Sequence, residues 1–73
     1  AVRLAPEHTD AHVNLGNALT QSGRPAAALE HYETALRLKP AADVHYNLGV
    51  TLSDLHRLDE AEAHFKAALR LDP

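Results

Sequence analysis

Between residues 9 and 40, apolar residues recur at the spacing of a helix in two separate stretches. The first set is Ala11, Leu15, Ala18 and Leu19, and the second is Ala28, Tyr32, Ala35 and Leu36. Apolar positions three, four, seven and eight apart lie on one helical face. Ser22-Gly23-Arg24-Pro25 separates the sets, and Pro40 follows the second, where it would end a helix. The pattern predicts a helix, a short turn and an antiparallel helix.

The second half of the chain repeats the first with an offset of 33 residues. The tripeptide Asn-Leu-Gly occurs at 14–16 and again at 47–49, and Tyr32 is matched by Phe65. A third similarity links the segments that end at Pro6, Pro40 and Pro73. The sequence therefore predicts the tail of one repeat and a linker over residues 1–8, followed by complete repeats over residues 9–40 and 41–73.

A helix-turn-helix unit of this length and pattern resembles the tetratricopeptide repeat (TPR), and we identify the chain as a fragment of a longer array. The matching residues are Leu15, Gly16, Leu19, Gly23, Ala28, Tyr32, Ala35 and Pro40, and, in the second copy, Leu48, Gly49, Leu52, Ala61, Phe65, Ala68 and Pro73. The resemblance implies an all-α fold, a right-handed α-solenoid of antiparallel hairpins. It also implies binding of a peptide or protein partner, without catalysis or cofactor, in a concave groove lined by the first helix of each repeat.

Three histidines depart from the family pattern. His12 and His45 stand where the family usually has tryptophan or another large apolar residue, and His56 stands in place of the turn glycine Gly23. Histidine is among the residues that tolerate a positive φ, so we expect the turn to be kept with some strain. His31 and His64 repeat on the second helices, and we expect them to be half-exposed packing residues.

Glycine inside a helix costs about 1 kcal/mol relative to alanine, yet both repeats carry one. We expect Gly16 and Gly49 to allow close approach of the two helices in each hairpin, where burial offsets this cost. Asn14 and Asn47 precede them by two residues, which is about 200° around a helix of 3.6 residues per turn. The asparagines are therefore expected on the opposite face, toward a ligand.

The predicted binding surface is a mixed polar stripe on the first helix of each repeat. Its residues are Asp10, Val13, Asn14, Asn17, Asp43, Tyr46, Asn47 and Val50, and Gln21 and Asp54 continue the stripe at helical spacing. Glu33–Arg37 and Glu62–Lys66 pairs are instead expected on the second helices, at the favourable i,i+4 spacing of a solvated face. Stacked asparagine amides could hydrogen-bond an extended peptide backbone.

Two more specific functions found in the family make different demands on these residues. A clamp for acidic chaperone C-termini needs a lysine where Val13 stands, and the aspartates would repel a carboxylate. The asparagines at 14 and 47 also resemble the ladder in O-linked GlcNAc transferases, which leaves a substrate-recruiting arm of such an enzyme as an alternative. A further alternative is head-to-tail self-association through uncapped repeat ends.

The composition excludes several classes of function. The net charge of −3, from seven basic and ten acidic residues, has the wrong sign for nucleic-acid binding. No apolar run is long enough for a membrane span. The chain has no cysteine, which is compatible with any compartment. His8 and His12 are four residues apart, but we expect His8 to lie before the helix, and without further ligands we expect no metal site. Ser22 and Ser53 lack the partners of a catalytic triad, so no catalytic residue is expected.

Overall fold

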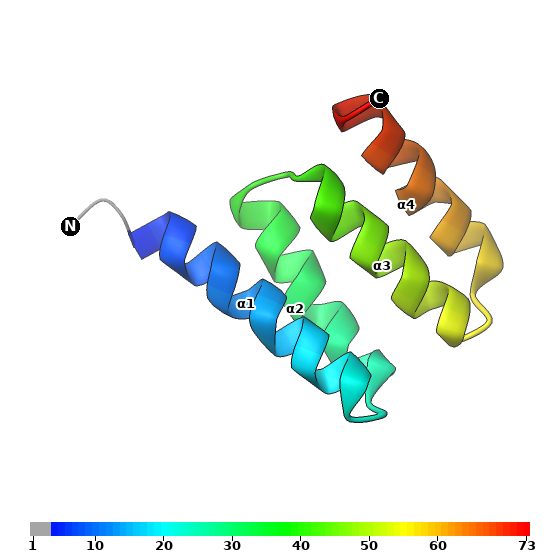
Figure 1. Ribbon diagram of the computed structural model, residues 1–73, viewed down its shortest axis with the longest axis horizontal. Coiled ribbons are helices and arrows are strands. Elements are labelled where there is room, and N and C mark those ends of the chain that lie inside the picture. Colours follow the sequence, from blue (N-terminus) through cyan, green and yellow to red (C-terminus); the bar gives the residue numbers. More distant parts are fainter. Residues whose placement is uncertain (1–3) are drawn as a thin grey trace.

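The computed structural model describes the backbone of residues 4–73 and the side chains of residues 9–73. Its helices are α1 (Leu4–Gln21), α2 (Pro25–Leu38), α3 (Ala42–Asp54) and α4 (Leu58–Leu71), and residues 4–73 contain no strand. Figure 1 shows two antiparallel hairpins side by side, α1 with α2 and α3 with α4, with α3 packed against α2. The predicted all-α fold of stacked helix-turn-helix units is confirmed.

The turns inside the two hairpins have the same backbone geometry despite their different sequences. Gly23 adopts φ 83° and His56 adopts φ 64°. The following N–H donates back to the preceding helix in both turns, from Arg24 to the Leu19 carbonyl at 2.7 Å and from Arg57 to the Leu52 carbonyl at 2.9 Å. Histidine therefore occupies a left-handed position that glycine adopts without strain.

The first helix begins earlier than the repeat pattern predicts. Residues 4–8 continue directly into the rest of α1, so they do not form the expected linker, and His8 lies inside the helix rather than before it. Pro6 is accommodated because the first turn of a helix needs no backbone N–H from it. The expected end of a preceding repeat over residues 1–3 lies outside the described residues, and the repeat boundaries 9–40 and 41–73 stay a prediction.

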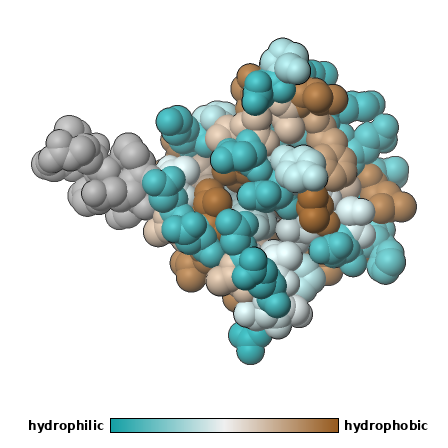
Figure 2. All heavy atoms as spheres, viewed as in Figure 1, coloured by the Kyte–Doolittle hydropathy of each residue, from teal (hydrophilic) through white to brown (hydrophobic). Residues whose placement is uncertain are grey.

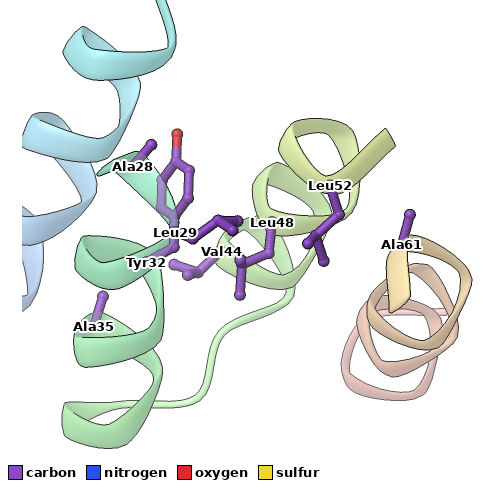
Figure 3. Close-up of a cluster of buried hydrophobic side chains, with 8 residues drawn as sticks. All are labelled: Ala28, Leu29, Tyr32, Ala35, Val44, Leu48, Leu52 and Ala61. Atoms are coloured by element: carbon purple, nitrogen blue, oxygen red, sulfur yellow. The ribbon is translucent and has the colours of Figure 1, made fainter. Parts of the chain in front are cut away.

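The hydrophobic core lies mainly between the two hairpins, where α2 faces α3. Figure 3 shows its buried side chains, which are Ala28, Leu29, Tyr32, Ala35, Val44, Leu48, Leu52 and Ala61. Of the predicted apolar positions of α2, Ala28, Tyr32 and Ala35 are buried and Leu36 is partly buried, and together with α3 they hold the second hairpin against the first.

Within each hairpin, a glycine lets an aromatic ring of the second helix approach the first helix closely. A Cβ on Gly16 would lie 2.6 Å from Cε1 of Tyr32, and a Cβ on Gly49 would lie 2.6 Å from Cε1 of Phe65. Both distances are far below van der Waals contact. The prediction that these glycines serve close packing inside each hairpin is confirmed.

Equivalent leucines in the two first helices have opposite environments. Leu48 is 0% exposed, whereas Leu15 is 48% exposed. Leu48 lies in the core with residues of α2 on one side, whereas no helix of residues 4–73 packs in the corresponding way on the outer side of α1. The same sequence pattern therefore gives a buried face in α3 and an accessible apolar face in α1.

Candidate functional site

A cleft of about 350 Å³ lies between the first helices of the two hairpins. It brings together four of the eight predicted groove residues, Asn17, Tyr46, Asn47 and Val50. Thr20, Gln21, Tyr32 and Thr51 complete its lining. Every polar side chain in this lining is uncharged, so the cleft suits hydrogen bonding to a neutral group such as a peptide bond.

Side chains in the cleft differ in how much of their hydrogen-bonding capacity is used. The Tyr32 hydroxyl donates to Oδ1 of Asn17, which leaves the two N–H groups of that amide as donors. The Thr20 hydroxyl donates to the Gly16 carbonyl at 2.9 Å. Asn47 and Gln21 make no side-chain hydrogen bond within the described part of the chain. The cleft therefore presents both donors and acceptors to a ligand.

Four predicted groove residues lie elsewhere. Asp10 and Asn14 are exposed on α1 and do not line the cleft. Val13 is half-buried and packs against the core, because α1 turns it toward its neighbours rather than toward solvent. Asp43 lines a second cleft. The predicted stripe is thus divided among a cleft, the core and open surface.

The second cleft, of about 520 Å³, is more apolar and lies along α3 and α4. Its lining consists of Ala42, Asp43, Tyr46, Phe65, Ala68, Leu69 and Asp72. Tyr46 is 57% exposed and belongs to both clefts. Its ring lies 5.6 Å from that of Phe65, with 53° between the ring planes, a favourable tilted arrangement. In Figure 2, exposed hydrophobic side chains are visible toward the α4 end of the molecule.

Sequence reasoning missed three residues of the first cleft, Thr20, Tyr32 and Thr51. The threonines are ambiguous in a pattern because they suit both a core and a surface. Tyr32 belongs to the apolar pattern and is 2% exposed in the core, but its hydroxyl reaches Asn17 of the cleft. The sequence contains a signal that relates Tyr32 to Asn17. Val50 stands at the position of Asn17 in the second repeat, and Phe65 stands at that of Tyr32, so both residues differ together between the repeats.

Each hairpin also contains one pair of histidines whose rings meet. Nδ1 of His12 lies 3.1 Å from Nδ1 of His31, and Nδ1 of His45 lies 3.0 Å from Nδ1 of His64. His31 and His64 thus pack as expected, His31 against His12 and His64 against His45. Burial, and secondly the nearby His64 imidazole, hold the pKa of His45 below its usual range. Among residues with described side chains, no three histidine or acidic residues cluster as metal ligands would.

The outward sides of α2 and α4 carry charged residues, as predicted. Lys66 Nζ lies 3.6 Å from a Glu62 carboxylate oxygen on the exposed side of α4. The expected Glu33–Arg37 pair does not form, because Arg37 donates instead to the Thr34 hydroxyl at 3.2 Å. Residues three and four positions away lie on the same helical face, so Thr34 competes with Glu33 for the Arg37 side chain. Such exposed contacts contribute little to stability.

Comparison with known protein families identifies the family of this chain. The model of the tetratricopeptide repeat family matches residues 1–41 and residues 14–73. These two matches together span the whole sequence, so the chain belongs to the tetratricopeptide repeat family, whose members generally bind proteins or peptides. No curated protein matches the sequence significantly. None of the helices in residues 4–73 combines the length and the apolar character that crossing a bilayer requires.

Proposed function

We propose that the chain binds an extended segment of a protein partner along the surface formed by α1 and α3. The observation that carries this proposal is the cleft with its unused amides, Asn47 and Gln21, beside the exposed ring of Tyr46. An extended peptide leaves its N–H and C=O groups free, and amide side chains satisfy both. The adjoining apolar cleft offers space for one of its side chains.

A displayed library of random 12-residue peptides is the probe for this proposal. The full chain is immobilised, and the peptides selected on it are tested against two variants that each carry two alanine substitutions. Asn14→Ala/Asn47→Ala should weaken binding by about five- to tenfold, because the hydrogen bonds lost with the Asn47 amide contribute about 1–1.5 kcal/mol. Glu33→Ala/Glu62→Ala, on α2 and α4, should change it less than about twofold. Equal effects of the two variants would contradict binding along α1 and α3.

A single-residue comparison separates the two asparagines, because only Asn47 lines the cleft. Asn47→Ala alone should account for most of the loss, and Asn14→Ala for little. The glycosyltransferase-arm alternative needs a continuous ladder with both asparagines on it. A larger effect of Asn14→Ala would favour that alternative over the cleft.

Head-to-tail association of two copies is a second proposed function, supported by the different exposure of Leu15 and Leu48. The junction of α2 with α3 buries Val44, Leu48 and Leu52. Their equivalents on α1 are Ala11, Leu15 and Leu19, and the equivalents of the α2 surface on α4 include Phe65 and Leu69. Docking α1 of one copy on α4 of another would repeat the internal junction.

Light scattering over a concentration series tests this association. Leu69 and Leu58 are matched, because they are 63% and 62% exposed on the same helix. Leu69→Ser removes a residue of the apolar cleft, whereas Leu58→Ser removes one that does not line it. The wild type and Leu58→Ser should gain mass with concentration, and Leu69→Ser should remain a monomer. A wild type that is monomeric at every concentration would overturn this second proposal.

A further inference from the structure

The basic residues of the described chain are confined to the second helix of each hairpin and the connecting segments. No lysine or arginine occurs between residues 4 and 23 or between residues 41 and 56, which include all of α1 and α3. The acidic residues with described side chains on these helices are Asp10, Asp43 and Asp54. The cations at residues 24, 37, 39, 57, 66 and 70 lie on α2, α4 and the connections. The net negative charge therefore belongs to the two helices that form the proposed binding surface.

On α3, carboxylates stand at both ends of the line of cleft residues. Asp43, Asn47, Val50 and Asp54 are spaced at i, i+4, i+7 and i+11 and share one helical face. At 1.5 Å rise per residue, the two aspartates are about 16 Å apart along the axis. An extended partner of a few residues lying over Asn47 would pass at least one of them.

These aspartates are not neutralised by the protein itself. Asp10, Asp43 and Asp54 are exposed, and none takes part in an ion pair within the described residues. The ion pairs formed there are Arg57–Glu60 and Glu62–Lys66, which lie at and along α4. Arg57 holds Glu60 with two hydrogen bonds of 2.7 and 2.8 Å, so it is already engaged. The carboxylates of α1 and α3 are thus available to a partner.

The aromatic ring of Tyr46 adds a second preference for cations. It is more than half exposed and lies one helical turn from Asp43, with which it shares the apolar cleft. A guanidinium stacks on an aromatic face while its N–H groups reach a carboxylate. Asp72 and Phe65 line the same cleft, so an arginine there would meet two carboxylates and two aromatic rings.

From this charge distribution we infer that the partner segment is basic, carrying arginine or lysine side chains that meet Asp43, Asp54 and Tyr46. The inference rests on the proposed function, because it names the chemistry of the segment bound along α1 and α3. Segments rich in carboxylates or phosphates are disfavoured by the same charges. Nucleic acid is disfavoured for the same reason.

The composition of peptides selected from the random 12-residue library tests the inference apart from the proposed function. Arginine and lysine should be enriched at least twofold over the unselected library, and binding should weaken as salt is raised from about 0.05 M to about 0.5 M. Peptides that need Asn47 but show no cationic enrichment would overturn the inference and leave the proposed function intact. Peptides indifferent to both asparagines would overturn the two together.

Matched charge variants locate the effect on the protein. Asp43→Asn/Asp54→Asn and Glu30→Gln/Glu33→Gln each remove two carboxylates, so both variants change the net charge equally. The first should weaken a selected basic peptide by about three- to tenfold, and the second by less than twofold. Equal weakening would mean that only overall charge matters, and it would overturn the inference.

A change on the peptide keeps the test independent of protein folding. Replacing each arginine of the selected peptide by citrulline removes the charge and keeps the shape of the side chain. Binding to the wild type should fall by at least as much as in the Asp43→Asn/Asp54→Asn variant, and that variant should discriminate less between the two peptides. Equal affinity of the arginine and citrulline peptides for the wild type would overturn the inference.

Discussion

The Tyr32 hydroxyl donates a hydrogen bond to Oδ1 of Asn17 across the first hairpin, and the second hairpin replaces both residues together. Phe65 stands at the position of Tyr32, and Val50 at that of Asn17. In the first hairpin the tyrosine hydroxyl and the asparagine amide satisfy each other by a hydrogen bond. Phenylalanine and valine in the second hairpin have no side-chain polar group that needs a partner. We infer from this exchange that the two positions are coupled, and it gives the two halves of the surface a different polarity.

Exchanging the first pair for the second tests this coupling. Tyr32→Phe leaves the Asn17 carbonyl without its donor, and Asn17→Val leaves the tyrosine hydroxyl without its acceptor. Each single variant should lower the free energy of unfolding by about 1 kcal/mol. The double variant should cost less than the sum, with a coupling of about 0.5–1.5 kcal/mol in urea unfolding. Strictly additive costs would mean that the hydrogen bond contributes nothing.

Alanine at the helical glycines should destabilise the chain although alanine is the better helix former. The gain in helix propensity is about 1 kcal/mol. Against it, the new Cβ of Gly49→Ala would meet the Phe65 ring at 2.6 Å, and overpacking of this kind costs about 1–3 kcal/mol. Urea unfolding should therefore show a net loss of stability for Gly49→Ala.

The neighbouring ring provides the control for this prediction. In a Phe65→Leu background the flat ring is absent, and the same Gly49→Ala change should become neutral or stabilising. A loss of stability that persists without the ring would place the cost in the helix backbone rather than in the contact with α4.

Much of the fold could be predicted because its signals are local. Helical spacing located the four helices, and Pro25 marks the first residue of α2 as expected. The start of α1 could not be read in this way, because Pro6 is compatible both with ending one helix and with beginning another. The exposure of Leu15 could not be predicted from the sequence either, since it depends on whether another helix packs beside α1.

The candidate site was predicted only in part because it depends on distances between helices. Helical spacing places Asn14 and Asn47 at equivalent positions, but the junction of the hairpins places only Asn47 in the cleft. The histidine pairs join residues 19 positions apart, a separation set by the turn between two helices. Their recurrence after 33 residues was the available signal.

Glycine at position 56 should stabilise the second hairpin. His56 adopts φ 64°, a conformation that costs a residue with a Cβ about 1 kcal/mol, and Gly23 shows that glycine forms the same turn. Part of the gain is offset by the greater freedom of glycine in the unfolded chain. His56→Gly should raise the melting temperature by a few degrees, since 1 kcal/mol corresponds to about 4–8 °C at this size.

The reverse change provides a check on the same turn. Gly23→His should lower the melting temperature by a similar amount, because a Cβ at Gly23 meets no neighbouring atom within 4 Å and only the backbone conformation is at stake. An unchanged melting temperature in both variants would show that the left-handed conformation carries no measurable strain.

Acidification should weaken the fold through the histidine pair of the second hairpin. Burial and the nearby His64 lower the pKa of His45 below its ordinary value of 6.5. The unfolded chain therefore takes up a proton at this residue more readily than the folded chain. The resulting stability is fully present above about pH 6.5 and is lost as pH falls through the lowered folded pKa. Urea unfolding between about pH 7.5 and pH 5 should show this decrease.

Two variants separate the pair from the other histidines. His45→Phe removes the group with the lowered pKa and restores the large apolar residue usual in the family, so the dependence of unfolding free energy on pH should become shallower. His56→Asn removes an exposed imidazole that has no ring partner among the described residues, and it should leave the dependence unchanged. A wild-type slope retained in His45→Phe would show that the acid sensitivity arises elsewhere in the protein.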